Sequence, residues 1–583
     1  MNSPCLKRTF CAFLLALSFC WSRHANGQHN SQIFSASPID DPTVAVNWER
    51  YYDHEGITEI CRKLVKAFPH LIRMESIGES FQGKRLWALT VTDFGAGDPD
   101  AKPALYLDGI ISHNGLQGSE YTLYTAWYLL ESYGKDAFIS QLLKEKTLYI
   151  IPLLYPDMRD KLMGTPEQRG PKGDNNPSDE DGDGLVDEDG PNDLNGDGFI
   201  TLMRRKNKAG KYVVDKDLKH HLLLAPRGEN GQFDLIGYEG HDNDGDGLVN
   251  EDPVGYLNPM TDWAWGWQPQ YLQQGASLYP FSLPENRAAK EFVLRHPNIA
   301  AAQNFKFPID FFYPETSGEG DTAPTDTSLV QLYASLETGY HQLLPHHFYA
   351  LSNTLTPDIY GGQLHWFWQA RGILPLQVEL YRFAPETDDA KEEGDKPRKK
   401  RKSKEESWLG KEAFTPWTPY EHPTYGSIEI GGFKKDFFQN ASDLSLSKEA
   451  HQVMIQTLYH LYQTPKLLIR KPSYSRLPNG NTEVFVTVVN LSKIPTHTPH
   501  DVSRKIERPD FVKLKDSTVV AGMLVTDKGK VIGKEQRLNP SRIEVPSIGA
   551  EDSVRVRWVT KSASPVLHFE VDSRKGGVVE KKF

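Results

Sequence analysis

The first third of the chain alternates between short apolar runs and stretches with helical periodicity. Apolar side chains recur at helical spacing over 58–68, and a helix rich in aromatic residues and leucine is expected to end near residue 131. Apolar runs typical of strands lie at 71–76, 86–92, 105–107 and 147–154. Because strands that alternate with helices form partly parallel sheets, this pattern predicts an α/β fold with a mixed central sheet flanked by helices.

The rest of the chain resumes this pattern and then changes to strict alternation. Helices are expected at 284–295, 328–336 and 447–462, and strands at 298–305 and 373–381. Beyond Pro465, apolar residues occupy every second position, as at Val484, Val486 and Val488, and Asn479-Gly480 is a typical hairpin turn. We therefore predict an α/β domain over 44–464 and a C-terminal β-sandwich domain over 465–583.

Two polar segments interrupt the α/β domain. A long polar insertion at about 160–255 is rich in Asp and Gly and breaks the alternation of strands and helices. Residues 386–407 have no apolar face and are predicted to form a solvated, mobile loop, because such a run cannot offset its ordering entropy. The basic part of that loop, 396–404, could alternatively contact an anionic surface.

The N-terminal residues have the features of a secretory signal peptide. Lys7 and Arg8 precede an apolar stretch over 10–21, and small residues lead to a predicted cleavage site at Gly27. The apolar stretch is too short to span a bilayer, so we expect export to the periplasm or the exterior and a polar lead over 28–43. The alternative is a lipoprotein with its lipid on Cys20. Because only Cys61 lies beyond the leader, no intrachain disulfide is expected.

Composition adds one exclusion. The 583 residues are 38% hydrophobic and 11% aromatic, as in globular proteins, and carry a formal net charge of -11. That charge argues against general nucleic-acid binding, which requires a basic face. The expected ligand is therefore not a nucleic acid.

The predicted strand at 105–107 leads through a polar loop into the aromatic helix. This unit reads DGIISHNGLQGSE over 108–120 and carries His113, Asn114, Gln117 and Glu120. A strand that leads through a loop into a helix is where α/β enzymes place their reactive groups. The loop is therefore the first candidate for a functional site.

Residues 44–464 resemble the M14 zinc carboxypeptidase family. The resemblance runs in collinear order through this loop and the segments PLLYPDMRD, HPNIAAAQNF, GILPLQVELY and FTPWTPYEHPTYGSIEIGG. It implies one zinc ion held by the His and Glu of an H-x-x-E loop and by a second His after a later strand. It also implies a Glu that acts as general base on the zinc-bound water.

The implied zinc ligands are replaced in this chain. Aligned without a gap, the family's loop keeps Asp108 and Gly109 but places Ser112 and Gly115 at the His and Glu positions. The second His position holds Lys306. Because catalytic zinc normally needs three protein ligands, the resemblance predicts that the zinc site is lost. A rebuilt site using His113 and Glu120 is the alternative.

Other family positions are kept or only loosely matched. Glu379 occupies the general-base position, and without a metal we expect it to form a salt bridge with Lys306. The family binds substrate through arginines and a tyrosine. The corresponding candidates in this chain are Arg159, Arg204, Arg205 and Tyr360.

Three near-copies of an Asp/Gly pattern in the insertion predict structural calcium. Each copy has Asp at position 1, Asp or Asn at position 3, Asp at position 5 and then Gly. This arrangement is the first half of a calcium loop. The candidate ligands are Asp179, Asp181, Asp183 and Asp187, then Asp193, Asn195 and Asp197, and finally Asp242, Asp244, Asp246 and Asp252. The alternative is an acidic, solvated insertion without metal.

These features support three functions. The first, favoured by the replaced ligands, is an exported M14-like pseudo-peptidase that binds peptides or peptide-like cell-wall material. The second is an active zinc carboxypeptidase that uses unrecognised ligands. The third is an extracellular structural or adhesion module that makes contact through its β-domain. Function depends on the site and not on the fold, and the site favours the first.

Overall fold

The computed structural model describes residues 37–109, 115–164, 184, 189–215, 220–243, 245, 247, 249–250, 257–273, 275–306, 327–343, 360–379, 414–434, 443–562 and 566–583. The predicted signal peptide and the charged segment 386–407 lie outside these residues. In this part of the chain, no helix has the length and apolar character needed to cross a bilayer.

The central sheet is mixed, as predicted, and has six strands within the described residues. Their order is β1 (Ile72–Glu79), β2 (Arg85–Val91), β4 (Thr147–Ile151), β3 (Ala104–Asp108), β9 (Ile299–Lys306) and β10 (Leu374–Glu379). Strands β3, β4, β9 and β10 are parallel, whereas β1 and β2 pair antiparallel at one edge. Strands β3 and β4 are buried along their whole length, as expected for the centre of such a sheet.

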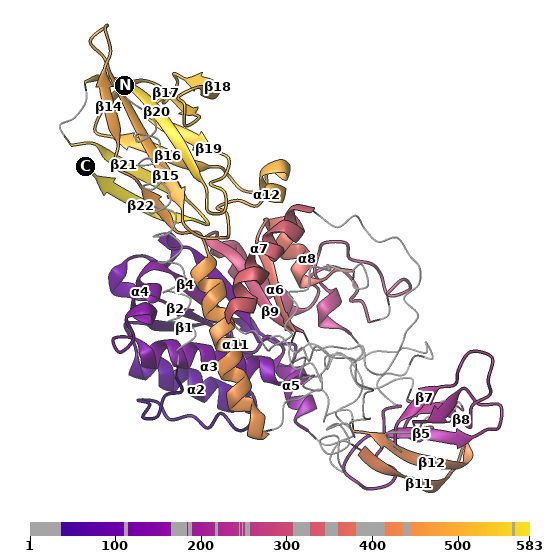
Figure 1. Ribbon diagram of the computed structural model, residues 1–583. Helices are drawn as coiled ribbons and strands as arrows, with labels where there is room; N and C mark the ends of the chain where they lie inside the picture. Colours follow the sequence, from indigo (N-terminus) through magenta and orange to yellow (C-terminus); the bar gives the residue numbers. More distant parts are fainter. Residues whose placement is uncertain are drawn as a thin grey trace, which may run out of the picture.

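Helices cover this sheet. They are α2 (His54–Ala67), α3 (Gln117–Ser132), α4 (Ala137–Glu145), α5 (Pro156–Leu162), α6 (Pro284–Arg295), α7 (Thr327–Leu343), α8 (Gln363–His365) and α11 (Asp443–Gln463). The π-helix Trp366–Ala370 follows α8, and short 3-10 helices lie at η1 (Phe94–Ala96), η2 (Pro99–Ala101) and η4 (Pro259–Thr261). Every residue of α3 is buried, because the helix packs against α2, α11 and β3 (Figure 1). Cys61 of α2 is also buried, and burial raises the pKa of its thiol to about 12.

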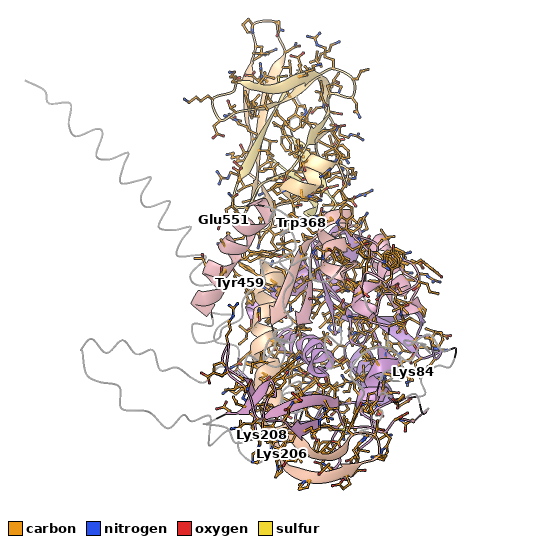
Figure 2. All side chains as sticks on the ribbon, turned by 90° about the vertical axis from the view of Figure 1, so that its right-hand side faces the viewer. Lys84, Lys206, Lys208, Trp368, Tyr459 and Glu551 are labelled. Atoms are coloured by element: carbon orange, nitrogen blue, oxygen red, sulfur yellow. The ribbon has the colours of Figure 1, made fainter. Side chains whose placement is uncertain are left out.

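Part of the insertion folds into a second sheet with a hairpin from far along the chain. The strand order is β11 (Phe414–His422), β12 (Gly426–Phe433), β5 (Leu202–Lys206), β8 (Phe233–Tyr238), β6 (Tyr212–Val214) and β7 (Leu222–Leu224). A small core of Met203, Ile428 and Ile430 joins the two segments. This sheet lies apart from the central sheet, at the end of the molecule opposite the C-terminal domain, where Figure 2 labels Lys206 and Lys208.

The C-terminal residues form two antiparallel sheets that face each other, which confirms the predicted β-sandwich. One sheet contains β13 (Leu467–Ile469), β14 (Ser473–Arg476), β15 (Thr482–Asn490), β17 (Thr518–Val525), β18 (Val531–Gln536) and β20 (Ser553–Ser562). The other contains β16 (Asp510–Lys515), β19 (Arg542–Val545), β21 (His568–Ser573) and β22 (Gly577–Lys582). Their inward side chains share one core around Val486, Trp558 and Phe569. A short helix, α12 (Pro499–Arg504), lies on the side facing the α/β domain (Figure 1).

Candidate functional site

The candidate site lies where the parallel strands end. Asp108, Lys306 and Glu379 are the last residues of β3, β9 and β10, so all three lie at the carboxyl edge of the sheet. The parallel register pairs Glu379 directly with Lys306, which puts their backbones about 4.8 Å apart, the spacing of adjacent strands. The side chains of Lys306 and Glu379 lie outside the described part of the structure. Their salt bridge stays a prediction, to which this register is favourable.

A line of buried polar side chains crosses the same edge. Gln363 donates from Nε2 to Asp108 Oδ2 at 2.6 Å and accepts at Oε1 from Asn304 Nδ2 at 2.9 Å. All three residues are buried, and the π-helix Trp366–Ala370 follows Gln363 closely. π-Helical turns are rare and often mark functional sites. Sequence reasoning missed Gln363 and Asn304. The only available signal was the polar pair Gln303-Asn304 inside an otherwise apolar strand.

Glycine at position 109 is required by the tight exit from β3. Its backbone N–H donates to Ile151 O at 2.9 Å, and a Cβ there would lie 2.1 Å from Pro152 O and 2.9 Å from Ser119 Cα. Such distances are far inside van der Waals contact, so any side chain would push β3, the β4 loop and α3 apart. Gly109 therefore allows the end of β3 to lie close to Pro152 and to Ser119 of α3.

Glu120 is engaged in a buried ion pair. Its Oε1 is paired with Nη2 of Arg159 and accepts from Tyr52 N at 3.1 Å. Burial raises the pKa of Glu120, and the positive charge of Arg159 opposes that change. Arg159 also donates to Tyr52 O at 2.6 Å and to Leu116 O at 2.7 Å. This carboxylate is held by the fold, so the alternative in which Glu120 swings in as a zinc ligand does not agree with the structure.

The candidate substrate-binding residues do not form one cluster. All three side-chain nitrogens of Arg159 bond to protein groups beside α3. Arg204 lies in the second sheet, where Glu429 pairs with it at 2.7 Å and the rings of Phe233 and Trp417 lie on its guanidinium. Arg205 is exposed on the same strand. Tyr360 is exposed, and its backbone N–H and C=O bond to the side-chain amide of Gln273.

Two of the acidic loops adopt the same backbone arrangement. Asp193 accepts from the N–H groups of Gly196 and Gly198, each at 2.8 Å, and Asp242 accepts from those of Gly245 and Gly247 at 2.6 and 3.1 Å. The ligand candidates Asp179, Asp181, Asp183, Asp187, Asp244, Asp246 and Asp252 lie outside the described residues. Within the described residues, no group of three or more His, Cys, Asp or Glu side chains is placed to hold a metal. Calcium binding stays a prediction.

Two family patterns match the chain. Residues 57–160 match the zinc carboxypeptidase family, peptidase M14, and residues 466–583 match a domain of unknown function, DUF8731. Residues 57–160 are therefore an M14 carboxypeptidase-like segment of the chain. The M14 match contains β1, β2, β3 and β4 together with the loop that leads from Asp108 into α3, so it includes one of the two chain segments that would supply zinc ligands.

The relatives include both peptidases and a protein named inactive. Carboxypeptidase D of Rattus norvegicus is 24% identical over 139 residues, which are 24% of this chain and 10% of that protein. The inactive metallocarboxypeptidase ECM14 of Ajellomyces capsulatus (strain H143) is 32% identical over 133 residues, 23% of this chain and 22% of that protein. The crystal structure of carboxypeptidase A from Helicoverpa armigera has 13% identity and a TM-score of 0.36 over 75% of this chain and 81% of that one. The chain thus spans a tenth to about a fifth of the length of these two sequence relatives.

An M14 carboxypeptidase-like protein is expected to hold zinc at this edge, but the described residues do not fit the metal. Gly115, at the Glu position, is buried and offers no donor atom. Glu120, the nearest carboxylate in the sequence, is neutralised by Arg159. The side chains of Ser112 and Lys306 lie outside the described part, but neither a neutral hydroxyl nor an ammonium is a normal zinc ligand.

Proposed function

We propose that this chain is an exported M14-like pseudo-peptidase, which binds peptides or peptide-like cell-wall material without cleaving them. The observation that carries this proposal is the buried Gly115 at a ligand position, with the neighbouring Glu120 committed to Arg159. A carboxylate already paired with a buried guanidinium cannot ligate a dication without leaving that guanidinium uncompensated, which is strongly unfavourable.

The proposal also uses the register of β9 and β10. Lys306 and Glu379 are register partners at the carboxyl ends of β9 and β10, the edge where the family holds its dication and its general base. An ammonium has three N–H donors, so Lys306 can pair with Glu379 and still donate to the free carboxylate of a peptide C-terminus. This edge is then a carboxylate-binding surface, and no nucleophile is generated there.

The test compares binding with cleavage. Peptides with free and with amidated C-termini are titrated into the full-length protein by calorimetry, and the same mixtures are followed by mass spectrometry. We expect the free peptides to bind more tightly and to remain intact. Release of C-terminal residues that stops on addition of a chelator would contradict the proposal and favour an active zinc carboxypeptidase.

A matched pair of variants locates the binding. Lys306→Met removes the predicted cation. Lys434→Met removes a half-buried lysine just after β12, whose ammonium lies over the Phe199 ring in the insertion. The first variant is expected to abolish the preference for free C-termini, and the second to leave it unchanged. Equal loss in both would place the binding elsewhere.

A further inference from the structure

The C-terminal β-domain contacts the M14-like domain through a buried lysine. Lys575, in the turn between β21 and β22, donates from Nζ to Arg371 O at 3.1 Å and to Gly372 O at 2.8 Å. The same ammonium pairs with Asp501 Oδ2 at 2.9 Å. Lys575 is buried, and these contacts fix it at the residues that lead directly into β10.

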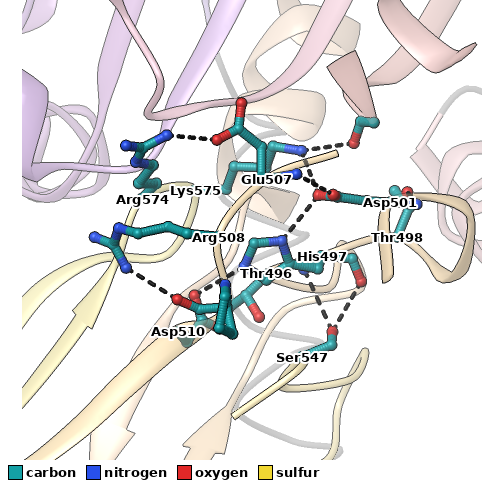
Figure 3. Close-up of polar contacts among 12 residues, drawn as sticks. Thr496, His497, Thr498, Asp501, Glu507, Arg508, Asp510, Ser547, Arg574 and Lys575 are labelled. Atoms are coloured by element: carbon teal, nitrogen blue, oxygen red, sulfur yellow. Dashed lines mark hydrogen bonds and ion pairs between the residues drawn. The ribbon is translucent and has the colours of Figure 1, made fainter. Parts of the chain in front are cut away.

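Asp501 of α12 links this lysine to a second buried group in the β-domain. Its Oδ2 also bonds to His497 Nδ1 at 2.8 Å, and the other ring nitrogen, Nε2, bonds to Asp510 Oδ1 at 3.0 Å (Figure 3). Oδ1 of Asp501 accepts from Glu507 N at 2.9 Å. The carboxylate of Glu507 in turn pairs with Arg371 at 2.5 Å and with Arg574 at 2.6 Å. Charges of both signs therefore alternate across the interface.

Two glycines allow the domains to approach this closely. A Cβ at Gly372, which has φ +57°, would lie 2.6 Å from Asp501 Cβ. A Cβ at Gly577, which has φ +77°, would lie 2.7 Å from Ala101 O and 2.9 Å from Pro103 Cδ. Each glycine comes from a different domain, so close backbone contact is built into both sides of the interface.

A second buried lysine braces the connection between the domains from the other side. Lys146, just after α4, donates from Nζ to Thr464 O at 2.9 Å and to Pro465 O at 2.6 Å. The adjacent Lys466 pairs with Glu145 at 2.7 Å. The residues that follow α11 are thus held at the end of α4, while Lys575 holds the two residues Arg371 and Gly372 before β10. Figure 2 shows Trp368, which packs on the His500 ring, at the level where the two domains meet.

We propose that residues 466–583, which match a domain of unknown function, act as an intramolecular clamp that binds the residues preceding β10 and the end of α11. The partner surface is the M14-like domain of the same chain, recognised by the carbonyls of Arg371 and Gly372 and by the guanidinium of Arg371. The clamp holds the chain just before β10. Glu379 lies at the other end of that strand, away from the residues that the clamp binds.

The proposal predicts how the domain detaches. Lys575→Met keeps the length of the side chain but leaves Asp501 without its lysine, and trypsin then cuts after Lys466 at least about tenfold faster than in wild type. Lys513→Met is the matched control, because Lys513 pairs with Glu570 and Asp572 inside the β-domain. This control is expected to be cut at the wild-type rate.

Small-angle X-ray scattering on the same full-length proteins supplies the second readout. Lys575→Met and Gly372→Ala are expected to increase the radius of gyration, and Lys513→Met is not. An unchanged radius and an unchanged cleavage rate in both interface variants would overturn the proposal. If neither variant is soluble, amide hydrogen exchange of the wild-type protein supplies the test. The clamp predicts that β10 and β22 open in one cooperative step, and opening in two independent steps would refute the proposal.

Discussion

The stability of the β-domain interface should depend on the charge of His497. Burial alone would lower the pKa of this imidazole, but its bonds to Asp501 and Asp510 outweigh burial and raise the pKa to about 9. Its ordinary value is 6.5. The difference corresponds to about 3 kcal/mol, since one pH unit of pKa difference is about 1.4 kcal/mol. Because the folded pKa is raised, this stabilisation is complete below pH 6.5 and is lost as the pH rises through about 9.

A second group titrates in the same window with the opposite effect. Burial lowers the pKa of Lys146 to about 7, so the unfolded chain binds more protons than the folded one above that pH, and stability rises there. Wild type alone therefore does not isolate His497. The informative quantity is the difference in pH dependence between wild type and His497→Gln, which keeps a hydrogen-bonding side chain but does not titrate.

The assay is urea denaturation of both proteins at pH 6 and pH 9.5, followed by far-UV circular dichroism. Wild type is expected to lose about 3 kcal/mol more of its free energy of unfolding over this interval than the variant does. Far-UV dichroism at each starting pH controls for loss of the native fold before urea is added. The same pH dependence in the two proteins would refute the assignment of a charged, doubly bonded His497.

Three further predictions concern the candidate site and the insertion. Gly109→Ala should destabilise the fold by about 3 kcal/mol or more through overpacking against Pro152 O, as measured by the urea midpoint; an unchanged midpoint would show that the strand exit relaxes freely. Glu120→Gln and Arg159→Met should each lower the free energy of unfolding by about 3 to 5 kcal/mol. A double mutant that loses much less than the sum of the two single losses would confirm that the residues are coupled, whereas additive losses would contradict it. If the acidic loops hold calcium, a chelator should lower the melting temperature of wild type by several degrees, and that of a variant carrying Asp193→Asn and Asp242→Asn by less. The same wild-type melting temperature with and without chelator would argue for a metal-free insertion.

Local sequence patterns were sufficient to predict the strands of the central sheet but not the ends of every helix. The apolar runs became β1 to β4, and the expected helix at 284–295 became α6 with the same ends. Helix α2 begins at His54 and not at the predicted Thr58, because Asp53 caps it by accepting from Gly56 N. The first three residues of α2 are His54, Glu55 and Gly56, so hydrophobic periodicity did not reveal the start of the helix.

Long-range pairing was not visible in the sequence. The hairpin of β11 and β12 joins β5 of the insertion through β12, with Glu429 opposite Arg204, 225 residues earlier. Nothing in either segment alone specifies that partner. Likewise, the resemblance placed Arg159 among substrate-binding candidates, but only the structure showed that Tyr52, Leu116 and Glu120 occupy its donors. An aligned position gives the residue type, whereas its role depends on which side chains surround it.

The zinc content of the purified protein tests the central claim most directly. Wild type and the triple variant Ser112→His, Gly115→Glu and Lys306→His are stripped with a chelator, reloaded with zinc, dialysed and measured by mass spectrometry. The variant restores the three ligand types that a catalytic zinc requires, so it is expected to retain about one zinc per chain and wild type almost none. One tightly held zinc per chain in wild type would contradict the loss of the metal site.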